Sequence, residues 1–257
     1  MGVGLHSKRT PLKQHPLRLP GQSVQDEIDR LADEKLLFYV LLAFLATGMA
    51  IWEWWRSYVQ APYAPVLMTV FAVGAVAFSA FRIAAIRKRL IALRLGRDGE
   101  RVVAETLDKL RSAGAVVFND LQGGHFNVDH VVVSRHGLFA VETKTYSKRS
   151  GARITFDGKT LIVDGVRLDR DPIEQARANA RWIASKIRDT TGKDLRVKPV
   201  VVFPGWFVNP VREQGGSDVW VLNPEALPSF VLQEPRSVSE QDFSLAVVTF
   251  ASMARGA

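Results

Sequence analysis

Two long stretches of the sequence carry no charged side chain, and they restrict the possible folds more than any other feature does. They cover residues 36–52 and 57–81. Each is long enough, at about 1.5 Å per helical residue, to cross roughly 30 Å of hydrocarbon, the first only just. A buried core helix is the alternative, but neither stretch shows a polar stripe with a period of about 3.6 residues. The sequence predicts two transmembrane helices at about 36–55 and 62–84, within residues 36–86.

The turn between the two stretches is rich in amphipathic aromatic rings, which favour the membrane interface. Its aromatic residues are Trp52, Trp54, Trp55, Tyr58 and Tyr63. Pro62 and Pro65 suit the start of the second helix, because proline is tolerated in a first helical turn. The aromatic cluster therefore supports a helical hairpin whose turn lies at one membrane surface.

The distribution of Lys and Arg predicts the orientation of this hairpin. Residues 1–35 are expected to form a polar arm, in which three prolines prevent a long helix before about residue 22. The arm carries Lys8, Arg9, Lys13, Arg18, Arg30 and Lys35. The other flank carries Arg82, Arg87, Lys88, Arg89 and Arg94, and the turn carries Arg56 alone. Because Lys and Arg are enriched on the cytoplasmic side, both termini are predicted to be cytoplasmic.

Residues 90–257 have the pattern of a cytoplasmic α/β domain. Amphipathic repeats and turn signals place its elements. In chain order we expect a helix at 97–114, strands at 115–120, 126–134 and 138–146, a hairpin at 154–163, a helix at 172–192, strands at 197–206 and 219–223, and a helix at 238–254. The Asp157-Gly158 pair marks the hairpin turn. The order helix, three strands, helix, strand predicts an αβββαβ arrangement.

The composition limits the chemistry that such a domain can carry out. The 257 residues include no cysteine, which excludes a structural disulfide, a thiol nucleophile and a Cys-ligated metal. The 34 Lys and Arg exceed the 26 Asp and Glu, which gives a net charge of +8. Most of this excess lies after residue 82. A positive excess suits a polyanion such as nucleic acid, or an anionic membrane surface.

Three charged residues stand out once the strands are placed. Glu142 and Lys144 are two positions apart on one predicted strand, so their side chains share a face, and Asp129 lies on the neighbouring strand. Two close carboxylates repel each other unless a hard divalent cation neutralises them, and Mg²⁺ or Mn²⁺ suits oxygen ligands. A surface ion pair of Glu142 with Lys144, or a capping role for Asp129, is the alternative. The set favours metal-assisted phosphodiester hydrolysis.

This pattern resembles the PD-(D/E)-x-K nuclease superfamily, and residues 96–207 resemble its NERD, or nuclease-related, domains. The matching segments are 96–100, 127–133, 137–144, 172–175 and 199–203. The resemblance implies a restriction-endonuclease-like αβββαβ core with a central mixed sheet, here preceded by a two-helix transmembrane hairpin. Val128 stands where the superfamily name has proline.

The resemblance also assigns roles to individual residues. It makes Asp129 and Glu142 the ligands of Mg²⁺ or Mn²⁺, and Lys144 the base that positions the attacking water. It makes Glu100 an accessory carboxylate from the first helix, and Gln175 a polar group from the second. For Gln175 a plain position on the helix surface is the alternative. His125, His130 and His136 match no usual zinc spacing, and His130 should point away from Asp129.

Further basic residues are candidates for contacts with nucleic acid. They are Lys148, Arg149, Arg153, Arg177, Arg181 and Lys186. Such a set either lines a phosphate-binding face or forms an ordinary solvated surface. No aromatic-rich base-stacking motif accompanies it, so we expect any binding to be independent of sequence. The collar formed by Arg87, Lys88, Arg89 and Arg94 is explained by anionic lipid and topology.

The sequence as a whole predicts a membrane-anchored, metal-dependent nuclease-like protein that faces the cytoplasm, with DNA favoured over RNA as its substrate. One alternative is a catalytically inactive nuclease-fold module that binds nucleic acid or a protein partner at the membrane. Another is a structural membrane protein with a soluble tail.

Overall fold

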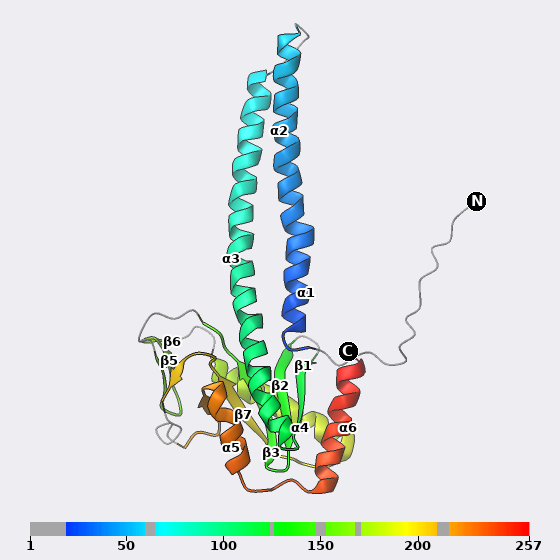
Figure 1. The fold of residues 1–257 in the computed structure, drawn as a ribbon, viewed down its shortest axis with the longest axis vertical. Helices are drawn as coiled ribbons and strands as arrows, with labels where there is room; N and C mark the ends of the chain where they lie inside the picture. Colours follow the sequence, from blue (N-terminus) through cyan, green and yellow to red (C-terminus); the bar gives the residue numbers. More distant parts are fainter. Residues whose placement is uncertain are drawn as a thin grey trace, which may run out of the picture. The chain divides into compact units, whose positions relative to one another are not determined.

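The computed structural model describes residues 19–59, 65–123, 126–146, 153–167, 171–209 and 216–256 (Figure 1). The chain divides into two compact units. One is Gln22–Asp98, and the other is Gly99–Ala257 together with the segment that precedes Gln22.

The first unit is a pair of long helices. A helical segment begins with α1 (Gln22–Arg30), passes through one π-helical stretch (Leu31–Leu36) and continues as α2 (Leu37–Tyr58). It packs beside the first part of α3 (Pro65–Ser112), as Figure 1 shows. Both helices are long and apolar enough to cross a membrane. Many of their large apolar side chains are exposed, among them Phe44, Phe71 and Phe81. The core helices of soluble proteins do not expose so many large apolar side chains.

Polar contacts join these two helices along their length. The Trp54 indole donates to the Thr69 hydroxyl at 2.8 Å, and Arg82 donates to the Tyr39 hydroxyl at 2.8 Å. Where the helices become polar, a small core of Ile28, Leu31, Ile86 and Leu90 continues the packing. Arg89 of the basic collar forms an ion pair with Glu27 there. At least one collar residue therefore holds the helices together.

Helix α3 is longer than the sequence predicts. The sequence predicts one helix at about 62–84 and another at 97–114, whereas the structure has a single helix from Pro65 to Ser112. The reason lies in the intervening residues, which contain Ala, Leu, Ile, Arg and Lys and no proline. Gly96 is tolerated within this helix. The segment predicted to link two helices is therefore itself helical.

The second unit is built on a five-stranded mixed sheet with the order β1-β2-β3-β7-β9. The strands are β1 (Val116–Gln122), β2 (Asn127–Ser134), β3 (Gly137–Thr143), β7 (Val197–Val202) and β9 (Trp220–Leu222). The first three pair antiparallel, and β7 and β9 run parallel to β3. The predictions of a mixed α/β fold and a central mixed sheet are confirmed.

Helices cover both faces of this sheet. The end of α3 packs on one face through Val103, Leu107 and Leu110, and α5 (Leu227–Gln233) lies on the same side. Helices α4 (Pro172–Thr191) and α6 (Glu240–Gly256) cover the other face. Both α4 and α6 are close to their predicted positions. The helix, three strands, helix, strand order is observed within the described residues.

A smaller sheet of four strands, in the order β6-β5-β4-β8, packs against the carboxyl end of β7. It consists of β4 (Arg153–Phe156), β5 (Leu161–Val163), β6 (Val166–Arg167) and β8 (Phe207–Val208). The predicted hairpin is confirmed as β4 and β5, and the Asp157 carboxylate accepts hydrogen bonds from the Lys159 and Thr160 amides in its turn. The short strand β8, which pairs parallel to β4, is not predicted from the sequence.

Candidate active site

The pairing of β2 with β3 brings Asp129 beside Glu142. His130 lies opposite Val141 in this ladder, so the next position places the two acids side by side. The Asp129 carboxylate accepts a hydrogen bond from the Thr143 amide at 2.7 Å. His130 faces the other side of the sheet, as predicted, where its Nδ1 lies 2.9 Å from the Asn119 side-chain oxygen.

Glu142 is held from two directions. Its Oε1 accepts a hydrogen bond from the Lys144 ammonium at 2.7 Å, and its Oε2 accepts one from the Asn179 amide at 2.8 Å. Lys144 also donates to Gln175 Oε1 at 2.9 Å. Gln175 and Asn179 are four residues apart on α4, so they face the strand together. Glu142 and Asn179 are only 2% and 3% exposed, which makes this a buried polar network.

The carboxylates of the site affect one another's protonation. Loss of water raises the pKa of Asp129 well above its ordinary value, and the charges of Glu142 and Glu100 raise it further. Burial also raises the pKa of Glu142, although Lys144 and Asn179 oppose this. For Lys144, burial alone would lower the pKa, but Glu142 outweighs it and the pKa is raised. Lys144 therefore carries its proton at neutral pH.

Glu100 enters the same electrostatic group from α3. Burial, together with the charges of Asp120 and Glu142, raises its pKa to about 7. Asp120 is 2% exposed and accepts a hydrogen bond from the Asn127 amide at 3.0 Å. Its φ of 50° interrupts the regular β1 ladder. The site thus contains more acidic groups than the one ammonium of Lys144 can neutralise.

Asn179 and Asp120 belong to the site but are not among the residues predicted from the sequence. Asn179 carried a usable signal, since it follows Gln175 by one helical turn on a face otherwise formed by alanine and isoleucine. Asp120 lies in a left-handed backbone conformation at the end of β1, and no local pattern marks it as part of this site.

The donor set suits a hard divalent cation. Asp129, Glu142 and Glu100 offer oxygen atoms only, and their mutual repulsion would be relieved by positive charge. Among the described residues, no group of three or more His, Cys, Asp or Glu converges on a common point. Mg²⁺ does not require one, because one or two carboxylates, waters and substrate phosphate commonly complete its shell. Of the other two histidines that match no usual zinc spacing, His136 forms a hydrogen bond with the Glu234 carbonyl oxygen, and His125 lies outside the described residues.

The basic residues predicted to contact phosphate lie in different settings. Arg177 forms ion pairs with Asp218 and Glu174 at 2.7 and 2.6 Å, so its charge is largely neutralised. Lys186 lies over the Trp182 ring. Arg181 is exposed on α4, and Arg153 is exposed on β4. Lys148 and Arg149 lie outside the described residues. They do not form one continuous basic face in the part of the chain that is described.

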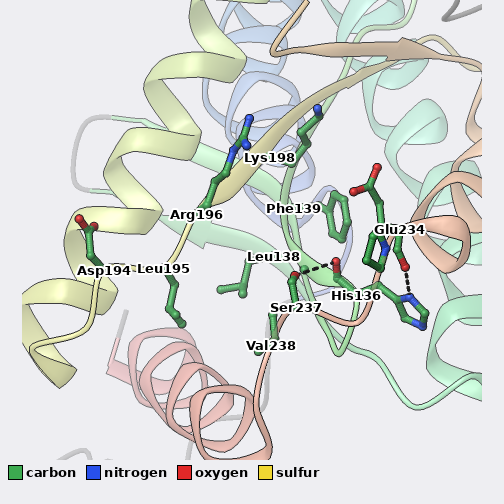
Figure 2. Close-up of a pocket in the computed structure, with 12 residues that line it drawn as sticks. His136, Leu138, Phe139, Asp194, Leu195, Arg196, Lys198, Glu234, Ser237 and Val238 are labelled. Carbon is green, nitrogen blue, oxygen red and sulfur yellow. Dashed lines mark hydrogen bonds between the residues drawn. The ribbon is translucent and has the colours of Figure 1, made fainter.

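A cavity of about 430 Å³ opens at the far end of β3 from this group. It lies beside Leu138 at the start of the strand, whereas Glu142 lies at its end. Figure 2 shows that its lining combines the cationic Arg196 and Lys198 with the carboxylate of Glu234. This cavity and the acidic cluster are therefore separate features of the domain.

Gly99 allows α3 to approach the end of β3. A Cβ atom at this position would lie 1.9 Å from Thr145 Oγ1 and 3.0 Å from Thr145 Cβ. No side chain fits into that space, so the glycine sets how closely Glu100 approaches the strands.

The two glycines of this part of α3 provide a matched test. Gly99→Ala should destabilise the protein by about 1–3 kcal/mol, because it overpacks the contact with Thr145. Gly96→Ala should stabilise it by about 0.5–1 kcal/mol, because nothing lies within 4 Å of the added methyl group. Thermal unfolding of the full chain measures both. Adding Thr145→Ala to Gly99→Ala should restore part of the loss, and equal effects of the two glycine substitutions would contradict the packing argument.

Comparison with known proteins supports the resemblance seen in the sequence. A scan against protein-family models matches residues 95–204 to NERD, the nuclease-related domain. Searches of curated proteins and of solved structures return no match. The matched region begins before Glu100 and contains Asp129, Glu142, Lys144 and Gln175. The match of residues 95–204 to the nuclease-related domain model is consistent with the PD-(D/E)-x-K superfamily.

Proposed function

We propose that the protein is a membrane-anchored, Mg²⁺- or Mn²⁺-dependent nuclease that cleaves phosphodiester bonds of nucleic acid, with DNA favoured over RNA. The observation that carries the proposal is the Asp129, Glu142 and Lys144 group within a nuclease-related domain. The β1-β2-β3-β7 order, with α3 and α4 on opposite faces, supports a restriction-endonuclease-like core. The net charge of +8 suits a polyanionic substrate.

In this proposal the residues divide the chemistry among them. Asp129 and Glu142 would hold the metal ion, which would polarise the phosphoryl group and lower the pKa of a bound water. Lys144 remains protonated, so it orients the water and stabilises developing negative charge; it does not accept the proton. Gln175 fixes the direction of the ammonium group. Glu100 supplies the additional negative charge that favours cation binding.

A catalytically inactive binding module is the second candidate. The observation in its favour is that both oxygens of Glu142 already accept hydrogen bonds, from Lys144 and from Asn179. A carboxylate that keeps both bonds would serve structure more than metal binding. On this alternative the domain binds nucleic acid or a protein partner without turnover.

A plasmid-cleavage assay tests the enzymatic proposal. The purified full chain in nonionic detergent should nick supercoiled DNA with Mg²⁺ or Mn²⁺ and not with EDTA. Glu142→Gln and Lys144→Ala should each lower the rate by about 100-fold or more, because each removes a charge that acts on the transition state.

Exposed residues of the same charge serve as controls for this assay. Glu225→Gln and Lys109→Ala change side chains that lie on the surface of the same unit, and both should cleave at the wild-type rate. Binding of DNA without metal-dependent cleavage would favour the inactive module. Cleavage by Glu142→Gln at the wild-type rate would contradict the assigned site.

The membrane part of the proposal rests on α2 and the first part of α3. Their exposed apolar side chains and the basic residues on both flanks support two spanning helices with cytoplasmic termini. In this arrangement the turn near Val59 lies outside and the nuclease-related domain lies inside.

Because the chain has no cysteine, a single introduced thiol reports this topology. Val59 is 58% exposed beside the turn, and Leu232 is 43% exposed on α5. In intact cells a membrane-impermeant maleimide should label the Val59→Cys protein, and it should label the Leu232→Cys protein only after permeabilisation. The reverse pattern would contradict the orientation, and extraction of the protein by alkaline carbonate would contradict membrane insertion.

A further inference from the structure

The small sheet has one buried face and one open face. Ile154, Phe156, Leu161 and Val163 point into the core that contains α4 and the end of β7. Alternation along the strands and the pairings between them place five other side chains on the opposite face. We call this the outer face; it consists of Arg153, Thr155, Ile162, Arg167 and Phe207.

The outer face combines an exposed aromatic ring with cationic groups. Phe207 is 64% exposed and lies directly beside Arg153 in the β4–β8 pair. Arg167 lies beside Ile162 in the β5–β6 pair. Neither arginine forms an ion pair with any described residue. The four strands contain no Asp or Glu. The strands of this face therefore carry positive charge around an apolar ring, and the acids Asp157 and Asp164 lie in the adjoining turns.

The contacts of the preceding residue connect Phe207 to the candidate active site. Trp206 is 2% exposed, and its indole donates to the Tyr146 carbonyl at 3.2 Å. Tyr146 is two residues after Lys144, so the two Cα atoms are at most about 7 Å apart. Tyr146 also stacks on Phe203, which ends the β7 segment. This connection fixes β8 beside the strand end that carries Lys144.

We propose that the outer face is a binding platform for single-stranded nucleic acid, on which the Phe207 ring stacks with an unpaired base and Arg153 and Arg167 contact the flanking phosphates. Single-strand binders use this combination of an aromatic ring and a positive surface, and the stacking is independent of sequence. The bases of a duplex are already stacked on each other and do not offer a face to such a ring. The platform rests on the proposed nuclease function, because it would present a strand to Lys144.

Binding of a fluorescein-labelled oligothymidylate to the full chain, measured by anisotropy in EDTA over a range of salt concentrations, tests the platform. Phe207→Leu should raise the Kd about tenfold at every salt concentration. Phe207→Trp should keep the wild-type affinity, because it retains an aromatic face. Arg153→Ala should reduce the slope of log Kd against log salt by about 0.7, the loss of one phosphate contact. Arg236→Ala, which removes an exposed arginine near α5, should leave that slope unchanged.

The platform is overturned if the wild-type chain does not bind the oligothymidylate, or if Phe207→Leu and Arg153→Ala bind it as the wild type does. It is also overturned if Phe207→Leu weakens binding to a duplex or to anionic vesicles and not to the single strand. Plasmid cleavage separates this outcome from the proposed function. Plasmid cleavage by a chain whose outer face does not bind the oligothymidylate would contradict only the platform. Phe207-dependent binding without any cleavage would contradict only the proposed nuclease activity.

Discussion

The buried ion pair of Glu142 with Lys144 is the interaction on which the site depends. A carboxylate at the end of β3 can be buried only because the ammonium and the Asn179 amide satisfy its two oxygens. That arrangement in turn requires α4 to lie across the strand, with Gln175 and Asn179 on the facing side. The ion pair therefore links the position of α4 to the chemistry of β3.

The single ammonium group of Lys144 does not neutralise the negative charge of the carboxylates in the site. Burial raises the pKa values of Asp129, Glu142 and Glu100; repulsion by Glu142 and Glu100 adds to the effect on Asp129, and repulsion by Asp120 and Glu142 adds to the effect on Glu100. A fold that needed only stability would gain from replacing these acids with apolar residues. An excess of buried negative charge on the neighbouring strands β2 and β3 suits a site that binds a cation.

Much of this arrangement could be predicted from the sequence, because it depends on local periodicity. The alternation along β2 and β3 places Asp129 and Glu142 on one face and His130 on the other, and the Asp157-Gly158 pair marks a hairpin that forms. Relations between distant segments could not be predicted. Phe207 and Arg153 are far apart in the chain, and only the short β8 strand makes them neighbours. The continuity of α3 could not be predicted either, because the polar stretch within it indicates the end of a membrane helix.

The central claim is that Asp129 and Glu142 together bind a hard divalent cation. The most direct measurement is anomalous diffraction from crystals grown with Mn²⁺ at a pH above 7, where Glu100 is ionised. The account predicts an anomalous peak about 2.0–2.3 Å from a carboxylate oxygen of each residue, with waters completing the shell. A fully occupied Mn²⁺ site elsewhere in the domain, with Glu142 still bonded to both Lys144 and Asn179, would contradict it.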